Sequence, residues 1–271
     1  MMSVGLSSAA KLVGHEVSPV NYPGKQVDVD VGLANAAVKL TDPKVKSGCR
    51  LAFLKIIKSC EKEKNMGKVR KIHADAAEKN IVANDVYVAT ALITTYAKCG
   101  EIEKAQEVFD QIRTPSVVSW NSLISGYARN GFSDKALECF GKMQSAKVDP
   151  SLVTYVCVLK ACGALRSLET GKAIDAKVRK QGLLKKDVVL GTALVDMYSK
   201  CGEMEKAREV FEMLPMHDVV SWSALIDGYS RNGFGDEALK CFRRMQDARV
   251  HANAITYISL LKACGSVKSL E

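Results

Sequence analysis

The sequence predicts an all-helical chain in which helix–turn–helix repeats wind into a right-handed superhelical solenoid. The first observation is a long internal repeat: VVSWNSLISGYARNGFSDKALECFGKMQ at residues 117–144 returns as VVSWSALIDGYSRNGFGDEALKCFRRMQ at residues 219–246. The second is that the same offset of 102 residues relates 96–109 to 198–211 and 159–169 to 261–271. Because three unlike segments share one offset, they form a single larger period built from three smaller units.

The three units have the size of the hairpins that build helical solenoids. Cut at matching points, they run over residues 117–151, 152–187 and 188–218, which is 35, 36 and 31 residues. Units of this length are typical of helical repeat arrays. The pattern therefore divides the chain into a non-repeat segment at 1–49 and an array at 50–271, with units at 50–85, 86–116, 117–151, 152–187, 188–218, 219–253 and an incomplete unit at 254–271.

Each unit reads as two helices. In 117–151, an apolar stripe at helical spacing predicts a first helix, the Asn130-Gly131 pair ends it, and a second stripe predicts a second helix. The first stripe is Trp120, Leu123, Ile124 and Tyr127, and the second is Ala136, Leu137, Phe140 and Met143. Unit 86–116 repeats this design around a Cys99-Gly100 break. Since one hairpin cannot bury both stripes, neighbouring hairpins must stack, which leaves a concave surface lined by first helices.

Composition and charge narrow the class of partner. The chain has 271 residues, and 47% of them are hydrophobic, which is ample for a folded core. Its 39 Lys and Arg against 30 Asp and Glu give a net charge of +9, which favours a polyanion or an acidic surface. No run approaches the roughly 18 apolar residues of a membrane-spanning helix, so we expect no membrane partner.

The cysteines and histidines predict no metal site, no cofactor and no enzyme. Several of the nine cysteines recur in one repeat phase, and none forms a CxxC pair. The four histidines share no phase and make no ligand pattern near a cysteine pair. Recurrent cysteine on an apolar helix face is more simply a small buried residue, and nine thiols suit a reducing compartment. No catalytic constellation stands out.

One small polar position varies between otherwise matching copies: Asn121 becomes Ser223 beside an unchanged Trp. On a helix this position lies about 100° round from the Trp120 stripe, toward the concave groove. A short amide or hydroxyl there contributes little to packing but can hydrogen-bond to a base edge. The alternative is that both residues are solvated helix positions without a reading function.

The unit motifs resemble the pentatricopeptide repeat family in its plant-type arrangement of alternating standard, long and short units. The motifs are VVSWNSLISGYARNG at 117–131 (standard), YVCVLKACGALRSLETGK at 155–172 (long) and ALVDMYSKCGEMEKAREVFEMLP at 193–215 (short). Tetratricopeptide repeats are also helical hairpins, but they keep a 34-residue period and bind mainly peptides. The resemblance implies a single-stranded RNA-binding solenoid without catalytic activity, which acts in organelle RNA metabolism.

The resemblance also implies which residues read bases. In that family each unit is thought to read one base through its fifth and last residues, which here pair as Thr90 with Ser116, Asn121 with Ser151, Thr192 with Asp218, and Ser223 with Asn253. By analogy these pairs favour a purine, C or U, G, and A. The long units carry Leu54 with Asp85 and Val156 with Asp187, to which we assign no base. Second residues would sandwich the bases: Tyr87, Val118, Val189 and Val220.

The two ends give different expectations. Residues 1–49 are read as an organelle-targeting leader, a cap built on LANAAVKL at 33–40, or a disordered segment, and their acidic residues depart from a leader's profile. A full last unit would reach residue 289, so we expect a longer array. Plant relatives of this type often continue into a zinc deaminase-like domain that edits C to U, and this chain carries no such ligand set.

The sequence therefore predicts a specificity factor for C-to-U editing or another processing step on organelle transcripts. We expect it in the mitochondrion, with the chloroplast as the alternative, and its partners would be single-stranded RNA and editing or processing proteins. The rival interpretation is a protein-interaction solenoid whose groove binds an extended peptide.

Overall fold

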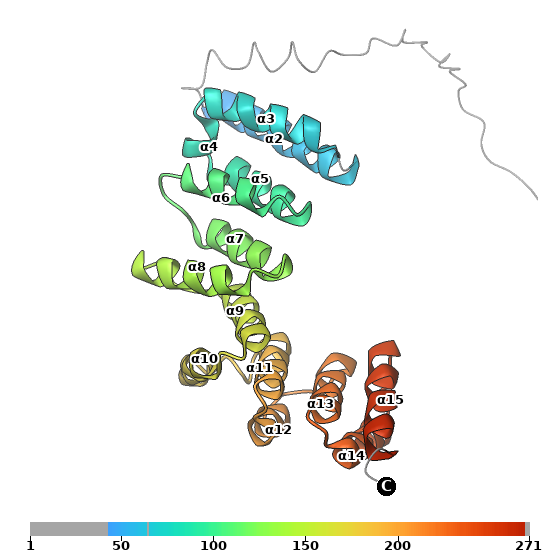
Figure 1. Cartoon of the computed structure of the whole chain (residues 1–271). Coiled ribbons are helices and arrows are strands. Elements are labelled where there is room, and N and C mark those ends of the chain that lie inside the picture. The colour runs from blue at the N-terminus through green and yellow to red at the C-terminus, as the bar shows by residue number, and fades with distance from the viewer. Residues whose placement is uncertain (1–42, 64, 269–271) are drawn as a thin grey trace, which may run out of the picture.

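The computed structural model describes residues 43–63 and 65–268, and every regular element among them is a helix. Helical hairpins follow one another as an elongated, curved stack (Figure 1). This confirms the predicted all-helical solenoid. The expected leader and the LANAAVKL segment lie outside the described residues.

Two sets of helices alternate along the chain. The first helices are α2 (Pro43–Glu63), α5 (Val86–Lys98), α7 (Val117–Arg129), α9 (Leu152–Leu165), α11 (Val188–Lys200), α13 (Val219–Arg231) and α15 (Ala254–Lys268). The second helices are α3 (Met66–Glu78), α6 (Ile102–Asp110), α8 (Ser133–Ser145), α10 (Leu168–Lys180), α12 (Met204–Glu212) and α14 (Gly235–Asp247). Each first helix contacts the next one, so they form an inner row, while α10, α12 and α14 lie on the outer side of the bend (Figure 1).

Polar side chains begin the first helices. Asp85, Ser116, Ser151, Asp187 and Asp218 each accept a hydrogen bond from a backbone N–H in the first turn. Such an N-cap satisfies an amide that has no partner within the helix, and it typically contributes about 1 kcal/mol. Each of these residues is the last residue of an expected unit, so the predicted boundaries coincide with helix starts.

The predicted Asn-Gly breaks also tie neighbouring units together. Asn130 donates its side-chain amide to the carbonyl of Gly126 in its own helix and to that of Ala97 in α5, both at 2.8 Å. Asn232 makes the equivalent bonds to Gly228 and Ser199. Gly131 follows with a φ of 84°, a left-handed conformation that glycine adopts without strain. An amide at this point therefore joins two first helices that belong to different units.

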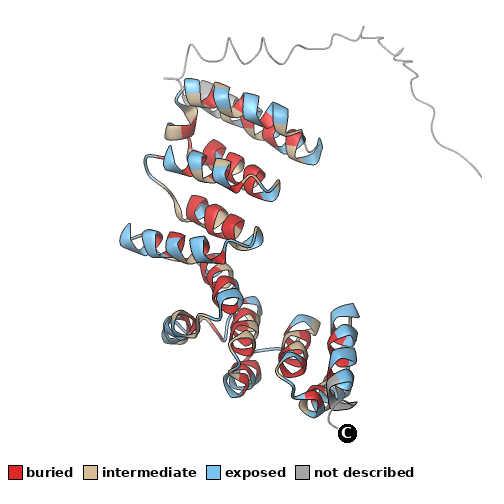
Figure 2. Cartoon of the chain, viewed as in Figure 1, coloured by how far each residue is buried: buried red, intermediate tan, exposed pale blue. Residues whose placement is uncertain are grey.

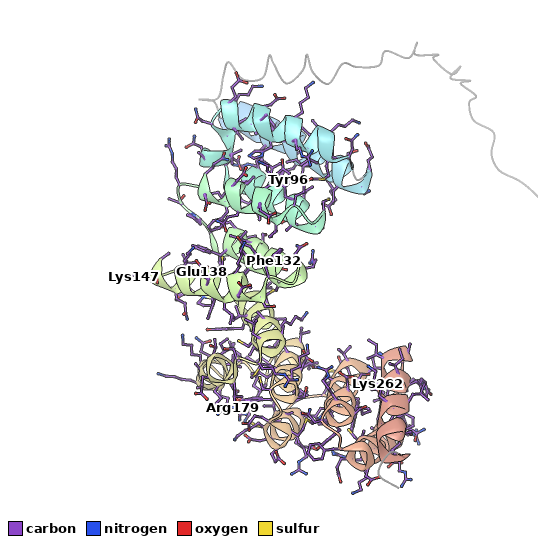
Figure 3. All side chains as sticks on the ribbon, in the orientation of Figure 1. Tyr96, Phe132, Glu138, Lys147, Arg179 and Lys262 are labelled. Atoms are coloured by element: carbon purple, nitrogen blue, oxygen red, sulfur yellow. The ribbon has the colours of Figure 1, made fainter. Side chains whose placement is uncertain are left out.

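The core lies between the helix layers, and exposed residues cover the outer faces (Figure 2). The predicted stripe of α7 is buried, whereas Leu137 of α8 is only partly buried. Trp120 packs edge-on against Phe109 of the preceding unit, with ring centroids 4.5 Å apart, and Trp222 repeats this against Phe211 at 4.7 Å. The hydroxyl of Tyr96, labelled in Figure 3, lies 3.2 Å from His73 Nδ1 and joins α5 to α3. The apolar stripes thus bury each other across unit boundaries.

Most described cysteines are packing residues, as expected. Cys60, Cys139, Cys162 and Cys241 are buried, and burial raises the pKa of Cys139 and Cys162 to about 12. Cys264 departs from the expectation because it is exposed. Its counterpart Cys162 lies in α9, which packs against α10 and α11, and no described helix takes those two places beside α15. Among the described residues, no cluster of His, Cys, Asp or Glu could hold a metal ion, and no helix meets the length and hydropathy of a membrane span.

Two details of the first unit differ from the prediction. The helix α2 begins at Pro43, ahead of the expected start at residue 50, and so takes in part of the segment assigned as non-repeat. Proline is well suited to this position, because the first helical residue needs no N–H partner. The same unit also holds a third, short helix, α4 (Ile81–Asn84), where two helices were expected.

Candidate nucleic-acid interface

A row of exposed apolar side chains runs along the inner helices, one at the second residue of each unit. The row contains the four residues predicted to sandwich bases, with exposed fractions of 61% for Tyr87, 58% for Val118, 66% for Val189 and 57% for Val220. Leu51, Val153 and Ile255 of the long units occupy the same place. Single exposed apolar residues are common on any surface, but a regular row marks a binding face.

The sequence interpretation missed Leu51, Val153 and Ile255, because it assigned no base to the long units. The signal was present in the spacing, since each is the second residue of its unit. The apolar row therefore continues through units that carry an aliphatic fifth residue.

The structure brings the fifth and last residues of the standard units together. Asn121 donates its amide to Ser151 Oγ at 2.9 Å, and Asn121 Oδ1 accepts from Thr154 Oγ1 at 2.5 Å. Ser223 Oγ lies 3.4 Å from Asn253 Oδ1 and 2.7 Å from Thr256 Oγ1. Each pair thus forms a small polar cluster at the start of the next first helix.

Ser223 corrects the expectation that the fifth residue lies in an open groove. Only 4% of its surface is exposed, and its hydroxyl also donates to the carbonyl of Val219 at 2.6 Å. Burial follows from α15, which places Thr256 directly against the hydroxyl. Asn121 is half-buried and longer, so its amide reaches past the equivalent Thr154 to Ser151. A ligand must therefore compete with these internal hydrogen bonds for Ser223.

Thr192 and Asp218 face a common hollow of about 270 Å³ between α9, α11 and α13. Val189 and Val220 of the exposed row line the same hollow, together with Val156 of the long unit. The Thr192 hydroxyl is buried and has no hydrogen-bond partner among the described residues. A buried polar group without a partner is uncommon, and here it belongs to a residue that lines the hollow. Asp218 caps α13 by accepting from the amides of Val220 and Ser221, so the carboxylate of this pair already has partners.

Thr90 and Ser116 form the remaining pair. Thr90 lines a second hollow, of about 430 Å³, together with Tyr87. Ser116 is engaged as the N-cap of α7, where it accepts from the Ser119 amide at 3.3 Å. Across the described residues, no hydrogen bond links these two side chains, and the same holds for Thr192 with Asp218.

The first long unit already uses its last residue for packing. Asp85 is buried and accepts from Arg50 Nε at 2.6 Å, and the Arg50 guanidinium lies 4.8 Å from the centre of the Tyr87 ring. Asp85 also caps α5. The Asp85 carboxylate therefore has its hydrogen-bonding partners within the fold.

The outer helices carry short-range ion pairs. Lysine and glutamate three or four residues apart pair on α6, α8, α12 and α14, and Arg179 of α10 pairs with Asp175 at 2.8 Å (Figure 3). The exposed lysine–glutamate pairs contribute little to stability, whereas Asp175 is buried. By contrast, Lys58, Lys62 and Lys98 line the larger hollow beside Thr90. Part of the positive charge thus lies on the face that holds the apolar row.

Comparisons with known proteins agree with the repeat pattern. The profile described as PPR repeat family matches residues 115–164 and 217–266, and the one described as PPR repeat matches 87–114 and 192–219. A pentatricopeptide repeat-containing protein of Arabidopsis thaliana named as chloroplastic is 39% identical over 88% of this chain and 39% of its own length. Another, named as mitochondrial, is 36% identical over 86% of this chain and 34% of its own length.

Solved structures share the fold. The pentatricopeptide repeat protein PPR10, solved in complex with an 18-nt psaJ RNA element, superimposes with a TM-score of 0.64 at 19% identity, over 85% of this chain and 36% of that one. PPR10 from maize gives 0.59 at 22% identity, over 89% of this chain and 37% of that one. The chain spans less than half the length of these relatives.

Proposed function

From the premise that this chain belongs to the pentatricopeptide repeat family, we propose that it binds single-stranded RNA in a sequence-specific manner and acts in organelle RNA metabolism. The observation that carries the proposal is the joint repetition of two features along the inner helices. An exposed apolar residue recurs once per unit, and a polar pair recurs beside it in the short and standard units.

The finer assignment extends this proposal. The 35, 36 and 31-residue cycle favours the plant-type arrangement of standard, long and short units, with the boundaries given above. By that analogy the protein is a specificity factor for C-to-U editing or another modification or processing step, and partner proteins supply any chemistry. Relatives named as mitochondrial and as chloroplastic support an organelle, and we place it in the mitochondrion with the chloroplast as the alternative.

The geometry suggests how a base would be held. A base entering the hollow between Val189 and Val220 would meet an apolar side chain on each face, and its edge would lie beside Thr192 and Asp218, the two polar residues of the pair that line the hollow. Apolar contact on the faces tolerates every base, whereas the edge distinguishes among them. With one base per unit, the array would favour the order purine, C or U, any base, G, A from 5′ to 3′.

We expect RNA affinity to fall at least tenfold between about 50 and 200 mM salt. Phosphate contacts release counterions, and for a single strand the logarithm of affinity falls by about 0.7 per contact for each tenfold rise in salt. Fluorescence anisotropy with a labelled RNA of the predicted order, measured across salt concentrations, tests this. The rival interpretation, an extended peptide in a largely apolar groove, predicts weak RNA binding that hardly responds to salt.

Exchanging one polar pair should change one base preference. Ser223→Asn with Asn253→Asp should convert the A preference of this unit to U, by about fivefold, since a hydrogen-bonded base contact discriminates by about 1 kcal/mol or more. The fold accommodates an asparagine in place of Ser223, because Asn121 occupies the equivalent place beside Thr154, the counterpart of Thr256. Competition between RNAs that differ at that base alone measures the change. An unchanged ranking in a folded variant would leave these residues as structural helix positions.

A further inference from the structure

Two aspartates distinguish the inner helices α11 and α13 from the other described inner helices. Asp196 and Asp227 stand four residues, one helical turn, after the fifth residues Thr192 and Ser223. Asp196 lines the 270 Å³ hollow together with Thr192. At the same place the other inner helices carry Lys58 in α2, Thr94 in α5, Ser125 in α7, Lys160 in α9 and Lys262 in α15, and Lys160 lines the same hollow as Asp196. Among the described inner helices, a carboxylate at this place is thus confined to α11 and α13.

Each aspartate is paired with the cation one turn further along its own helix. Lys200 Nζ lies 2.7 Å from Asp196 Oδ2, and Arg231 pairs with Asp227 in the same way. Asp227 also accepts from Ser259 Oγ of α15 at 3.0 Å. Both cations occupy the place that Lys62, Lys98 and Arg129 take in α2, α5 and α7.

The cations of the other inner helices are differently placed. Lys62 and Arg129 are exposed, and neither makes an ion pair with another described residue. Lys98 pairs with Glu61 of the neighbouring helix at 2.5 Å, and Lys58 and Lys62 line the larger hollow beside it. Among the described residues, Lys62 of α2, Arg129 of α7 and Lys160 of α9 thus make no ion pair, whereas Lys200 of α11 and Arg231 of α13 are each matched by an acid.

We propose that Asp196 and Asp227 are internal competitors for RNA phosphate. This inference rests on the proposed function and adds a division of labour within the groove. The two carboxylates hold Lys200 and Arg231 and repel phosphate themselves, so α11 and α13 contribute less to backbone binding than inner helices without an acid at this place. Binding by α11 and α13 depends on the base contacts instead, which makes a mismatch at the Thr192 and Ser223 units harder to tolerate.

The test is to release the two cations. Asp196→Ser restores the residue that α7 carries at this place, and Asp227→Asn keeps an oxygen to accept from Ser259. The double variant should bind single-stranded RNA more tightly, by about threefold for each pair released, and its salt slope should steepen by about 0.7 for each new phosphate contact. The gain should be similar for a mismatched RNA, because it comes from the backbone.

Glu169→Ser provides the matched control. Glu169 pairs with Lys172 at 3.3 Å on the outer helix α10, so this variant makes the same change in charge as Asp196→Ser alone, but away from the groove. Its affinity should rise less than twofold, and its salt slope should stay that of the wild type. An equal gain in this control would mean that net charge alone is responsible and would overturn the proposal.

A double-mutant cycle separates masking from general repulsion. Lys200→Ala should change RNA affinity by less than twofold in the wild type, because Lys200 is already held by Asp196. In the Asp196→Ser background the same change should cost about threefold. If the wild type binds RNA but Lys200→Ala has equal effects in both backgrounds, or the released variants bind no better, this inference is wrong and the proposed function stands. If neither the wild type nor the released variants bind RNA, the proposed function fails with it.

Discussion

A variant with serine in place of Val118, Val189 and Val220 is expected to bind RNA about a hundredfold more weakly than the wild type while keeping its stability. Each of these side chains is more than half exposed and lies on the row that would hold the bases. Removing an apolar contact to a base should cost about 1 kcal/mol, at the low end for a stacking residue, and three such losses correspond to roughly a hundredfold. Stability should hold, because exposed residues away from core contacts rarely change it by more than about 0.5 kcal/mol.

Binding of one labelled RNA, together with thermal unfolding, measures both halves of this prediction. The control variant carries serine at Leu165 and Met216, which are also exposed apolar residues but lie outside the row. Its affinity should remain that of the wild type. If the triple variant binds as well as the control, these three valines do not contact the bases, and the proposed apolar contact on each face of a base is wrong.

The sequence predicted the fold closely because the repeat fixes local pattern and stacking together. The stripe of Trp120, Leu123, Ile124 and Tyr127 can be buried only if hairpins stack, and the structure buries it against the preceding unit. Helices start directly after residues 116, 151 and 218, which end three of the expected units, because polar N-caps recur there. Local chemistry was sufficient for these elements.

What the sequence could not predict depends on contacts between units. The burial of Ser223 results from Thr256, which lies 33 positions away and arrives only when the next first helix stacks. The commitment of Asp85 to Arg50 likewise depends on a contact between residues 35 positions apart. The spacing of a single helix defines a face, but it does not say how closely the neighbouring helix covers that face. The candidate site could therefore be predicted less completely from the sequence than the fold could.

The last residue of each unit has a second role that limits how it can vary. Ser116, Ser151 and Asp218 begin helices by capping backbone amides, and Asn253 Oδ1 accepts from the Thr256 amide at 2.9 Å. Good N-caps are Ser, Thr, Asp and Asn, which are also short side chains able to meet a base edge. A change within this group, such as Asn253→Asp, keeps the cap. A larger side chain would cost stability before it changed specificity.

The spacing of the inner helices should itself be sensitive to one glycine, and Gly228→Val is expected to lower the free energy of unfolding by about 3 kcal/mol. A Cβ at Gly228 in α13 would lie 2.6 Å from Ser199 Cβ in α11 and 3.2 Å from Met204 Cε. The first of these separations is not sterically possible, so the two helices must move apart, and overpacking of a close interface typically costs about 1–3 kcal/mol. The movement would also change the distance between Val189 and Val220 and weaken RNA binding.

Gly141→Val is the matched control, because a Cβ at Gly141 in α8 meets no atom within 4 Å. Both changes replace glycine by the same residue inside a helix, which on its own is neutral or slightly stabilising. Urea unfolding followed by circular dichroism compares the two variants. Because a repeat array can unfold unit by unit, both the onset and the midpoint of the transition are compared. We expect Gly141→Val to unfold with the wild type and Gly228→Val to begin unfolding at clearly lower urea. Equal stability of the two variants would mean that the α11 and α13 interface yields without cost, and that helix spacing does not constrain the row that holds the bases.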